Sequence, residues 1–140
     1  MIALDANLFI YLLEGNPDFG QMAADVFLKI ESTSAPAMAS ELVYFEVLSS
    51  IKMSDELAAI AEAKIRSLEI TMYTSTERTM LLAARLRRDS GLGPLDALHV
   101  AAAIERGSDY FITNDLKLAN RDVRGIKIIK LSEADLAFQD

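Results

Sequence analysis

Four carboxylates occupy positions from which they could meet in one site: Asp5, Glu46, Asp96 and Asp115. Asp5 and Asp115 each follow a short apolar run. Carboxylates within about 5 Å of one another repel by roughly 1 kcal/mol per pair in water and by several-fold more near protein, so a protein retains such a cluster when it holds a cation. Oxygen ligands without Cys or His favour Mg²⁺ or Mn²⁺. Carboxylate-held metal at the ends of strands suits phosphoryl or phosphodiester chemistry.

Each carboxylate taken alone also has a purely structural explanation. Asp5 and Asp115 can cap the helices that follow them, and Asp96 suits the positive end of a helix dipole. Glu46 is harder to explain, because the helix predicted over residues 40–52 is apolar nearly all round. A carboxylate in such a helix costs free energy unless a partner compensates it. A shared metal site explains the four positions better than four separate structural roles.

Two further polar side chains lie close to these positions in sequence. Glu41 precedes Glu46 by five residues, which is about 140° around a helix, so we assign it a solvated or capping role outside the site. His99 lies one turn after Asp96, on the same helical face. It can touch the cluster or a phosphate, but we favour a packed, hydrogen-bonded imidazole and assign it no role as a general base.

The elements that must position these residues alternate between short apolar runs and longer periodic segments. We predict strands over residues 1–4, 35–38, 69–73, 109–113 and 126–131. We predict helices over residues 8–14, 19–31, 40–52, 54–68, 75–89 and 94–106, with short helical segments from residues 114 and 132. Asn7 is predicted to cap the first helix. This alternation predicts an α/β fold with a parallel sheet and helices on both faces.

The expected sheet topology brings the carboxylates together. Right-handed crossovers put the carboxyl ends of all the strands at one edge, and ligands bind there at the point where the strand order reverses. If the strands before Asp5 and Asp115 are neighbours at that point, both side chains enter one crevice. The helix that begins near Asp96 can present its N-terminus to the same edge.

Length and composition set the remaining bounds. The chain has 140 residues, 51% of them hydrophobic and 25% charged, which predicts one globular domain over residues 1–140. It has no Cys, which excludes disulfides and thiolate metal sites. We find no signal-peptide pattern and no apolar run of the roughly 18 residues that a membrane span needs, so we expect a cytoplasmic protein. The formal charge of −7 argues mildly against non-specific nucleic-acid binding, an objection that bound divalent cations would weaken.

Four segments carry a resemblance to a known family: residues 2–7 (IALDAN), 40–48 (SELVYFEVL), 95–103 (LDALHVAAA) and 111–115 (FITND). In their order, spacing and predicted context they resemble the PIN-domain ribonucleases, and more closely the VapC-type toxins of prokaryotic toxin–antitoxin pairs. The resemblance covers essentially the whole chain, and all four acidic positions of the family pattern are present.

This resemblance implies a three-layer α/β/α PIN-like fold with a central parallel sheet of about four to five strands. It also implies Mg²⁺- or Mn²⁺-dependent hydrolysis of RNA. By similarity, the acidic metal-binding set is Asp5, Glu46, Asp96 and Asp115, and the polar residues that assist it are Asn7 and Thr113. We expect Asp5 and Asp96 to be direct metal ligands. The implied partners are the RNA substrate, a cognate antitoxin protein and a second copy of the chain in a homodimer.

Basic and apolar residues provide candidate contacts for these partners. The basic residues near the acidic positions in sequence are Arg85, Arg87, Arg88, Lys117 and Arg121. Of these, Arg87, Arg88 and Lys117 are the main candidates for RNA phosphate contacts, with a solvated helix face as the alternative. The helices predicted over residues 8–14 and 19–31 carry more apolar surface than core packing needs, and the surplus could form a groove for an antitoxin segment.

Three alternatives stay open. An aspartyl-nucleophile phosphatase would typically have a second Asp where this chain has Asn7, and that reaction gives Glu46 no role. A non-catalytic binding module could keep the same fold. A housekeeping PIN nuclease in RNA processing would act without an antitoxin.

Overall fold

A parallel sheet of five strands forms the centre of the computed structural model, which describes residues 1–50 and 52–139. The strands are β1 (Ile2–Leu4), β2 (Ala37–Ser40), β3 (Thr71–Tyr73), β4 (Tyr110–Thr113) and β5 (Lys127–Lys130), in the order β3-β2-β1-β4-β5. All four pairings are parallel. The order therefore reverses between β1 and β4, the neighbours required to bring Asp5 and Asp115 to one crevice.

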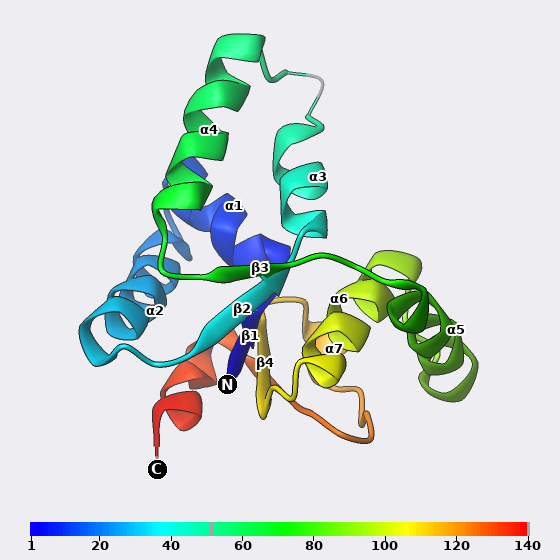
Figure 1. Ribbon diagram of the computed structural model, residues 1–140. Helices are drawn as coiled ribbons and strands as arrows, with labels where there is room; N and C mark the ends of the chain where they lie inside the picture. The colour runs from blue at the N-terminus through cyan, green and yellow to red at the C-terminus, as the bar shows by residue number, and fades with distance from the viewer. Residues whose placement is uncertain (51, 140) are drawn as a thin grey trace.

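Helices cover both faces of this sheet (Figure 1). They are α1 (Ala6–Glu14), α2 (Gly20–Thr33), α3 (Leu42–Leu48), α4 (Asp55–Ser67), α5 (Glu77–Ser90), α6 (Pro94–Glu105), α7 (Leu116–Ala119) and the C-terminal 3₁₀ helix η1 (Leu131–Phe138). One core packs α1 to α4 and η1 against the sheet, and a second core packs α5 to α7 against its other face. This is the three-layer α/β/α fold predicted from the sequence.

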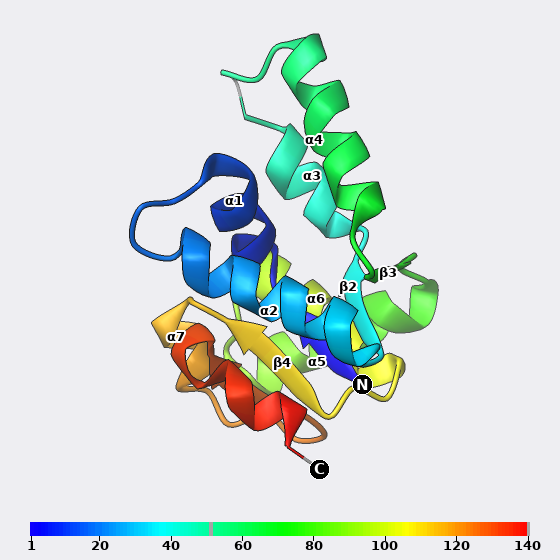
Figure 2. The same ribbon diagram turned by 90° about the vertical axis from the view of Figure 1, so that its left-hand side faces the viewer.

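The buried side chains of β1 alternate between the two faces of the sheet and so contribute to both cores. Ile2 and Leu4 belong to the first core and Ala3 to the second, because successive side chains of a strand point to opposite faces. On the first face, α2 and η1 lie side by side (Figure 2). Helices α3 and α4 project from the rest of the domain in both views (Figures 1 and 2). Within the described part of the chain, no helix is both long and apolar enough to cross a membrane.

Most predicted elements are confirmed, with shifts at their ends. The strand predicted over residues 35–38 is β2, which begins at Ala37 because Ala37 is the first partner of β1, opposite Ile2. The helix predicted over residues 40–52 is shorter, since α3 ends at Leu48 and Ser49 follows it as the C-cap. Residue 51 of that prediction lies outside the described residues.

The predicted cap of the first helix is wrong. Asp5, not Asn7, is the N-cap of α1. Asp5 has an extended backbone and its Oδ1 accepts the Ala6 N–H at 2.8 Å, which is how a capping carboxylate satisfies a free amide of the first turn. Asn7 lies inside the first turn, so its side-chain amide is available for contacts with β4.

Candidate active site

The carboxyl ends of β1 and β4 are joined through Asp5 and Thr113. The Asp5 N–H donates to the Ile112 carbonyl at 3.0 Å, which extends the pairing of the two strands by one bond. The Thr113 hydroxyl donates to Asp5 Oδ2 at 2.7 Å. Both side chains are buried, with Asp5 only 5% exposed. The Asp5 carboxylate is therefore fixed between two neighbouring strands.

Asn7 ties the same two strand ends together from α1. Its Nδ2 donates to Thr113 Oγ1 at 3.2 Å and more weakly to Asp5 Oδ2 at 3.5 Å, while its Oδ1 accepts the Asn114 N–H at 3.4 Å. Thr113 Oγ1 also accepts the Asp115 N–H at 3.0 Å. The structure thus places Asn7 and Thr113 beside two of the four carboxylates.

Asp115 caps a helix, which is one of the two roles considered for it from the sequence. Its Oδ1 accepts the N–H groups of Lys117 at 3.0 Å and Leu118 at 3.4 Å, so it caps α7. Its Oδ2 accepts no hydrogen bond from the described residues. Capping and membership of the cluster are therefore compatible, because each uses a different oxygen.

Asp96 faces the other carboxylates from the first turn of α6. Burial, followed by the charges of Asp5 and Asp115 and then of Glu46, raises the pKa of Asp96 from 3.8 to about 6, against an opposing effect of His99. Burial is the largest cause of this shift, and the added contributions of Asp5, Asp115 and Glu46 place these carboxylates within electrostatic reach of Asp96. Four segments distant in sequence, β1–α1, α3, α6 and β4–α7, therefore contribute to one acidic cluster.

Glu46 reaches this cluster paired with the only histidine of the chain. His99 Nε2 lies 2.9 Å from Glu46 Oε1, and the His99 side chain is almost fully buried while that of Glu46 is 22% exposed. The preference for a packed, hydrogen-bonded His99 is confirmed, and His99 also contacts a carboxylate of the cluster. Glu46 is less enclosed than its apolar helix suggested, since its side chain is partly exposed and the preceding residue, Phe45, is 61% exposed.

The charges in the cluster shift the pKa values of the two most buried groups. Burial, with a smaller contribution from Glu46, raises the pKa of Asp5 against the opposing effects of His99, Thr113 and the Ala6 amide. Burial lowers the pKa of His99, but its hydrogen bond to Glu46 and the charges of Asp5, Glu46 and Asp96 outweigh this and raise it overall. Both groups therefore hold their protons more tightly than isolated side chains do.

The donor set of this cluster fits a hard divalent cation. Asp96 accepts no hydrogen bond from the described residues, so both of its oxygens are available, and its raised pKa reflects burial first and the neighbouring negative charges second. Across residues 1–50 and 52–139, no three His, Asp or Glu side chains form a ready-made metal cage. Mg²⁺ does not need one, because it usually retains several waters and takes one or two carboxylates from the protein.

A hollow beside Asp96 and Asp115 brings basic side chains to the same place. Lys117 and Arg121 line it, together with the loop of residues 91–93. Arg87 and Arg88 are exposed in the last turn of α5, outside the residues that line it. Lys117 thus lies next to the cluster as expected. Arg121 lines the same hollow, although the sequence analysis did not place it among the main candidates for phosphate contacts.

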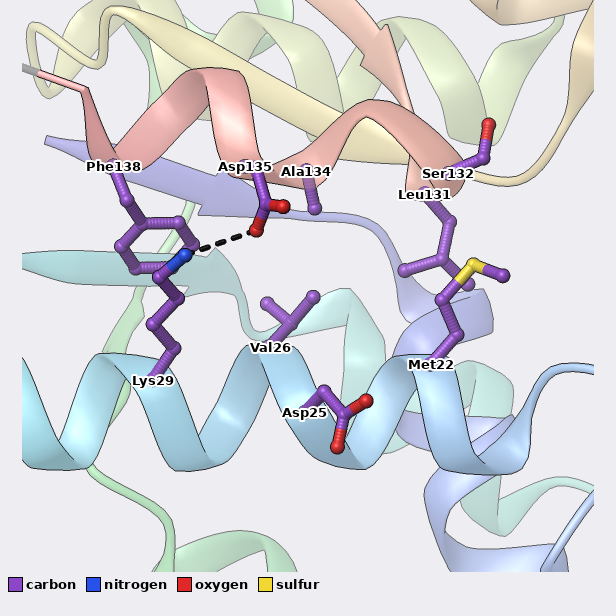
Figure 3. Close-up of a pocket in the computed structure, with 9 residues that line it drawn as sticks. All are labelled: Met22, Asp25, Val26, Lys29, Leu131, Ser132, Ala134, Asp135 and Phe138. Atoms are coloured by element: carbon purple, nitrogen blue, oxygen red, sulfur yellow. Dashed lines mark hydrogen bonds and ion pairs between the residues drawn. The ribbon is translucent and has the colours of Figure 1, made fainter.

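Two other features lie outside the cluster. Glu41 is the N-cap residue of α3, which agrees with one of its two expected roles, but its side chain makes no capping bond and instead accepts the Ser75 N–H at 3.1 Å. A separate hollow between α2 and η1 contains a Lys29–Asp135 ion pair at 2.9 Å (Figure 3). None of the residues lining that hollow is a predicted site residue.

Tyr11 contacts the residue that precedes Asp115, and the sequence analysis did not identify it. Its hydroxyl accepts a hydrogen bond from Asn114 Nδ2 at 3.0 Å. The signal was its spacing, since Tyr11 follows Asn7 by one helical turn and so lies on the same face of α1.

Comparison with known families identifies the fold and the family. The family model described as the PIN domain matches residues 2–123. The chain belongs to the PIN domain family. Comparison of this PIN-domain chain with curated proteins gave no match in sequence.

Solved structures share the whole fold at low sequence identity. VapBC2 from Rickettsia felis, bound to a promoter DNA fragment, is 16% identical with a TM-score of 0.72 over 93% of this chain and 98% of that one. A toxin–antitoxin complex from Klebsiella pneumoniae is 17% identical with a TM-score of 0.72, over 94% and 98%. VapC20 from Mycobacterium tuberculosis, a toxin that cleaves the sarcin–ricin loop, is 17% identical with a TM-score of 0.64, over 86% and 95%. At this identity the likeness establishes a common PIN fold.

Proposed function

We propose that this PIN-domain protein is an Mg²⁺- or Mn²⁺-dependent endoribonuclease and the toxin of a type II toxin–antitoxin pair. The observation that carries the proposal is the acidic cluster itself: Asp96 is half-buried within electrostatic reach of Asp5, Asp115 and Glu46, and its burial together with these charges raises its pKa to about 6. A cluster that disfavours its own ionisation gains stability from a divalent cation, and such a cation next to basic side chains suits a phosphodiester substrate.

The roles follow from the contacts of each residue. Asp96, with its free carboxylate, and Asp5 would hold the cation directly, while Glu46 and Asp115 would complete the site through waters. A bound cation would supply Lewis acidity toward the scissile phosphate and charge compensation for the leaving oxygen. Thr113 keeps Asp5 Oδ2 in place by donating to it at 2.7 Å.

Asn7 would have a supporting role at the same point. It contacts both Thr113 and Asp5, so it resists separation of the two strand ends. Residues that orient metal ligands in this way commonly affect metal affinity and activity by about 10- to 100-fold.

RNA would be held by basic side chains around the hollow. Lys117 and Arg121 are next to the acidic residues, so they are the best placed to contact a phosphate beside the scissile bond. Arg87 and Arg88 would contact more distant phosphates from the exposed end of α5. These four positive charges would offset locally the overall charge of −7.

An antitoxin would occupy apolar surface on the projecting helices. The residues expected to provide a groove are largely in the core, including Phe9 and Phe27. Surplus apolar surface lies instead on α4, where Leu57 is 55% and Ile60 is 66% exposed beside a hollow that also includes Ile10. The structural neighbour from Klebsiella pneumoniae is described as a toxin–antitoxin complex, which supports a protein partner here. A homodimer and a cytoplasmic location are part of the same proposal.

Cleavage of a mixed RNA pool by purified protein tests the enzyme directly. The reactions contain Mg²⁺, Mn²⁺ or EDTA, and Asp96→Asn is the matched inactive variant. Metal-dependent cleavage that disappears in the variant is the expected result. Metal binding without cleavage of any RNA would contradict a general ribonuclease, and absence of metal binding would favour a non-catalytic module on the PIN fold. Cleavage by a protein whose gene lies beside no antitoxin gene would favour a housekeeping nuclease.

A further inference from the structure

The chain contains a single histidine, and its imidazole is buried at the acidic cluster. His99 is 2% exposed, and its Nε2 lies 2.9 Å from Glu46 Oε1. Because a carboxylate accepts and does not donate hydrogen bonds, the proton of this bond lies on Nε2. The other ring nitrogen, Nδ1, is buried and has no hydrogen-bond partner among the described residues.

A purely structural role does not explain this arrangement well. A buried polar atom without a partner costs free energy, and an aliphatic side chain would fill the same core position without that cost. His99 occupies the position although its neighbours on α6, such as Val100 and Ala101, are apolar and fully buried. Within the described part of the chain, the bond to Glu46 is the only hydrogen bond of the imidazole, and a leucine could not make it.

Glu46 needs such a partner to stay in the cluster. It projects from α3, and its charge acts unfavourably on both Asp5 and Asp96. Mutual repulsion would favour rotation of the Glu46 carboxylate outward, toward the solvent that already reaches 22% of its side chain. The His99 N–H opposes this rotation by binding Oε1, and no residue of the described chain donates a hydrogen bond to Oε2.

We propose that His99 is a positioning residue that holds the Glu46 carboxylate within the metal site by donating from Nε2 to Oε1. This inference rests on the proposed metal-dependent activity. His99 acts through Glu46 and itself touches neither the metal nor RNA. It therefore couples α6, which carries Asp96, to α3, which carries Glu46.

Metal affinity in a double-mutant cycle tests the proposal without relying on catalysis. Titration calorimetry would measure Mn²⁺ binding to the metal-free protein and to His99→Leu, Glu46→Gln and the double variant. We expect each single change to weaken Mn²⁺ binding by about 10- to 100-fold and the double variant to be no weaker than either. His99→Gln keeps an N–H donor near the position of Nε2 and should recover most of the affinity.

A control on the same helix separates positioning from loss of packing. Val100→Ala creates a cavity in α6 without touching a polar group, so it should leave Mn²⁺ affinity unchanged. Equal affinity of His99→Leu and Val100→Ala would overturn the proposal, as would independent, additive effects of His99→Leu and Glu46→Gln. If either result were found while the wild type bound Mn²⁺ and cleaved RNA, the positioning role of His99 would be wrong but the proposed ribonuclease activity would still be supported. A wild-type protein that binds no Mn²⁺ would overturn both.

The single histidine also provides a readout that survives if a His99 variant does not fold. In untagged protein the imidazole signals in a long-range ¹H–¹⁵N spectrum can only come from His99. We expect the Nε2–H form in EDTA, a change of those signals in Glu46→Gln, and no change in a distant acidic variant such as Asp18→Asn. Imidazole signals identical in wild type and Glu46→Gln would overturn the proposal.

Discussion

Neutralising Asp96 should make the metal-free protein more stable while removing its response to metal. The pKa of Asp96 is raised from 3.8 to about 6, and each pH unit corresponds to about 1.4 kcal/mol. The full shift would be at most about 3 kcal/mol. Since roughly half of this carboxyl is in contact with water, screening reduces the figure to about 1 kcal/mol. Asp96→Asn also loses the favourable interaction of the carboxylate with the N-terminus of α6, which reduces the gain in stability further.

The pH dependence of this effect has a definite sign. The folded carboxyl holds its proton more tightly than the unfolded one, so the contribution of Asp96 to stability falls as the pH rises from about 4 to about 6 and is constant above. Asp96→Asn should therefore raise the free energy of unfolding by about 1 kcal/mol at pH 7.5 and have little effect near pH 4. In thermal melts the change at pH 7.5 is about 4 °C for a chain of this size.

Melting in EDTA and in Mg²⁺ gives the decisive comparison. Mg²⁺ at about 100 times its dissociation constant should stabilise the wild type by about 2.7 kcal/mol, whereas Asp96→Asn should respond little, so the order of stabilities reverses. Asp18→Asn, at an exposed turn position, is the matched control and should change neither melt. If Asp96→Asn were less stable than the wild type in EDTA at pH 7.5, or equally stabilised at pH 4, the electrostatic reasoning would be refuted.

Three further predictions follow from single contacts. Thr113→Val removes the hydroxyl that donates to Asp5. RNA cleavage should fall by about 10- to 100-fold, and the free energy of unfolding from chemical denaturation should fall by about 1–3 kcal/mol. Unchanged cleavage would contradict the role of Thr113. Replacing Lys117 and Arg121 by Ala should reduce the slope of log affinity for RNA against log salt by about 1.4, as measured by filter binding with a metal-site variant, and an unchanged slope would exclude both from phosphate contacts. Gly91 ends α5 with a φ of 67°, so Gly91→Ala should cost about 1 kcal/mol in urea unfolding, and an equally stable variant would show that this conformation can relax.

Much of the fold could be predicted because its signals are local. Apolar runs and helical periodicity identified all five strands and the longer helices, and the alternation of the two predicted a parallel sheet. Element ends were less accurate, because they depend on partners in space: β2 begins at Ala37 since Ile2 lies opposite it. The N-cap of α1 was misassigned to Asn7 for a similar reason, since that amide is engaged by Thr113 on a strand more than a hundred residues away.

The sequence by itself determined which residues could make an acidic site. Asp5 and Asp115 had to follow strands, and Asp96 had to begin a helix, since capping and periodicity depend on near neighbours. Only the tertiary structure decided how these groups are held. The proximity of β1 to β4 produced the Asp5–Thr113 bond, and the Glu46–His99 pair joins α3 to α6, two helices that belong to different cores. Contacts between segments distant in the chain depend on strand order and helix packing, which residue spacing alone does not specify.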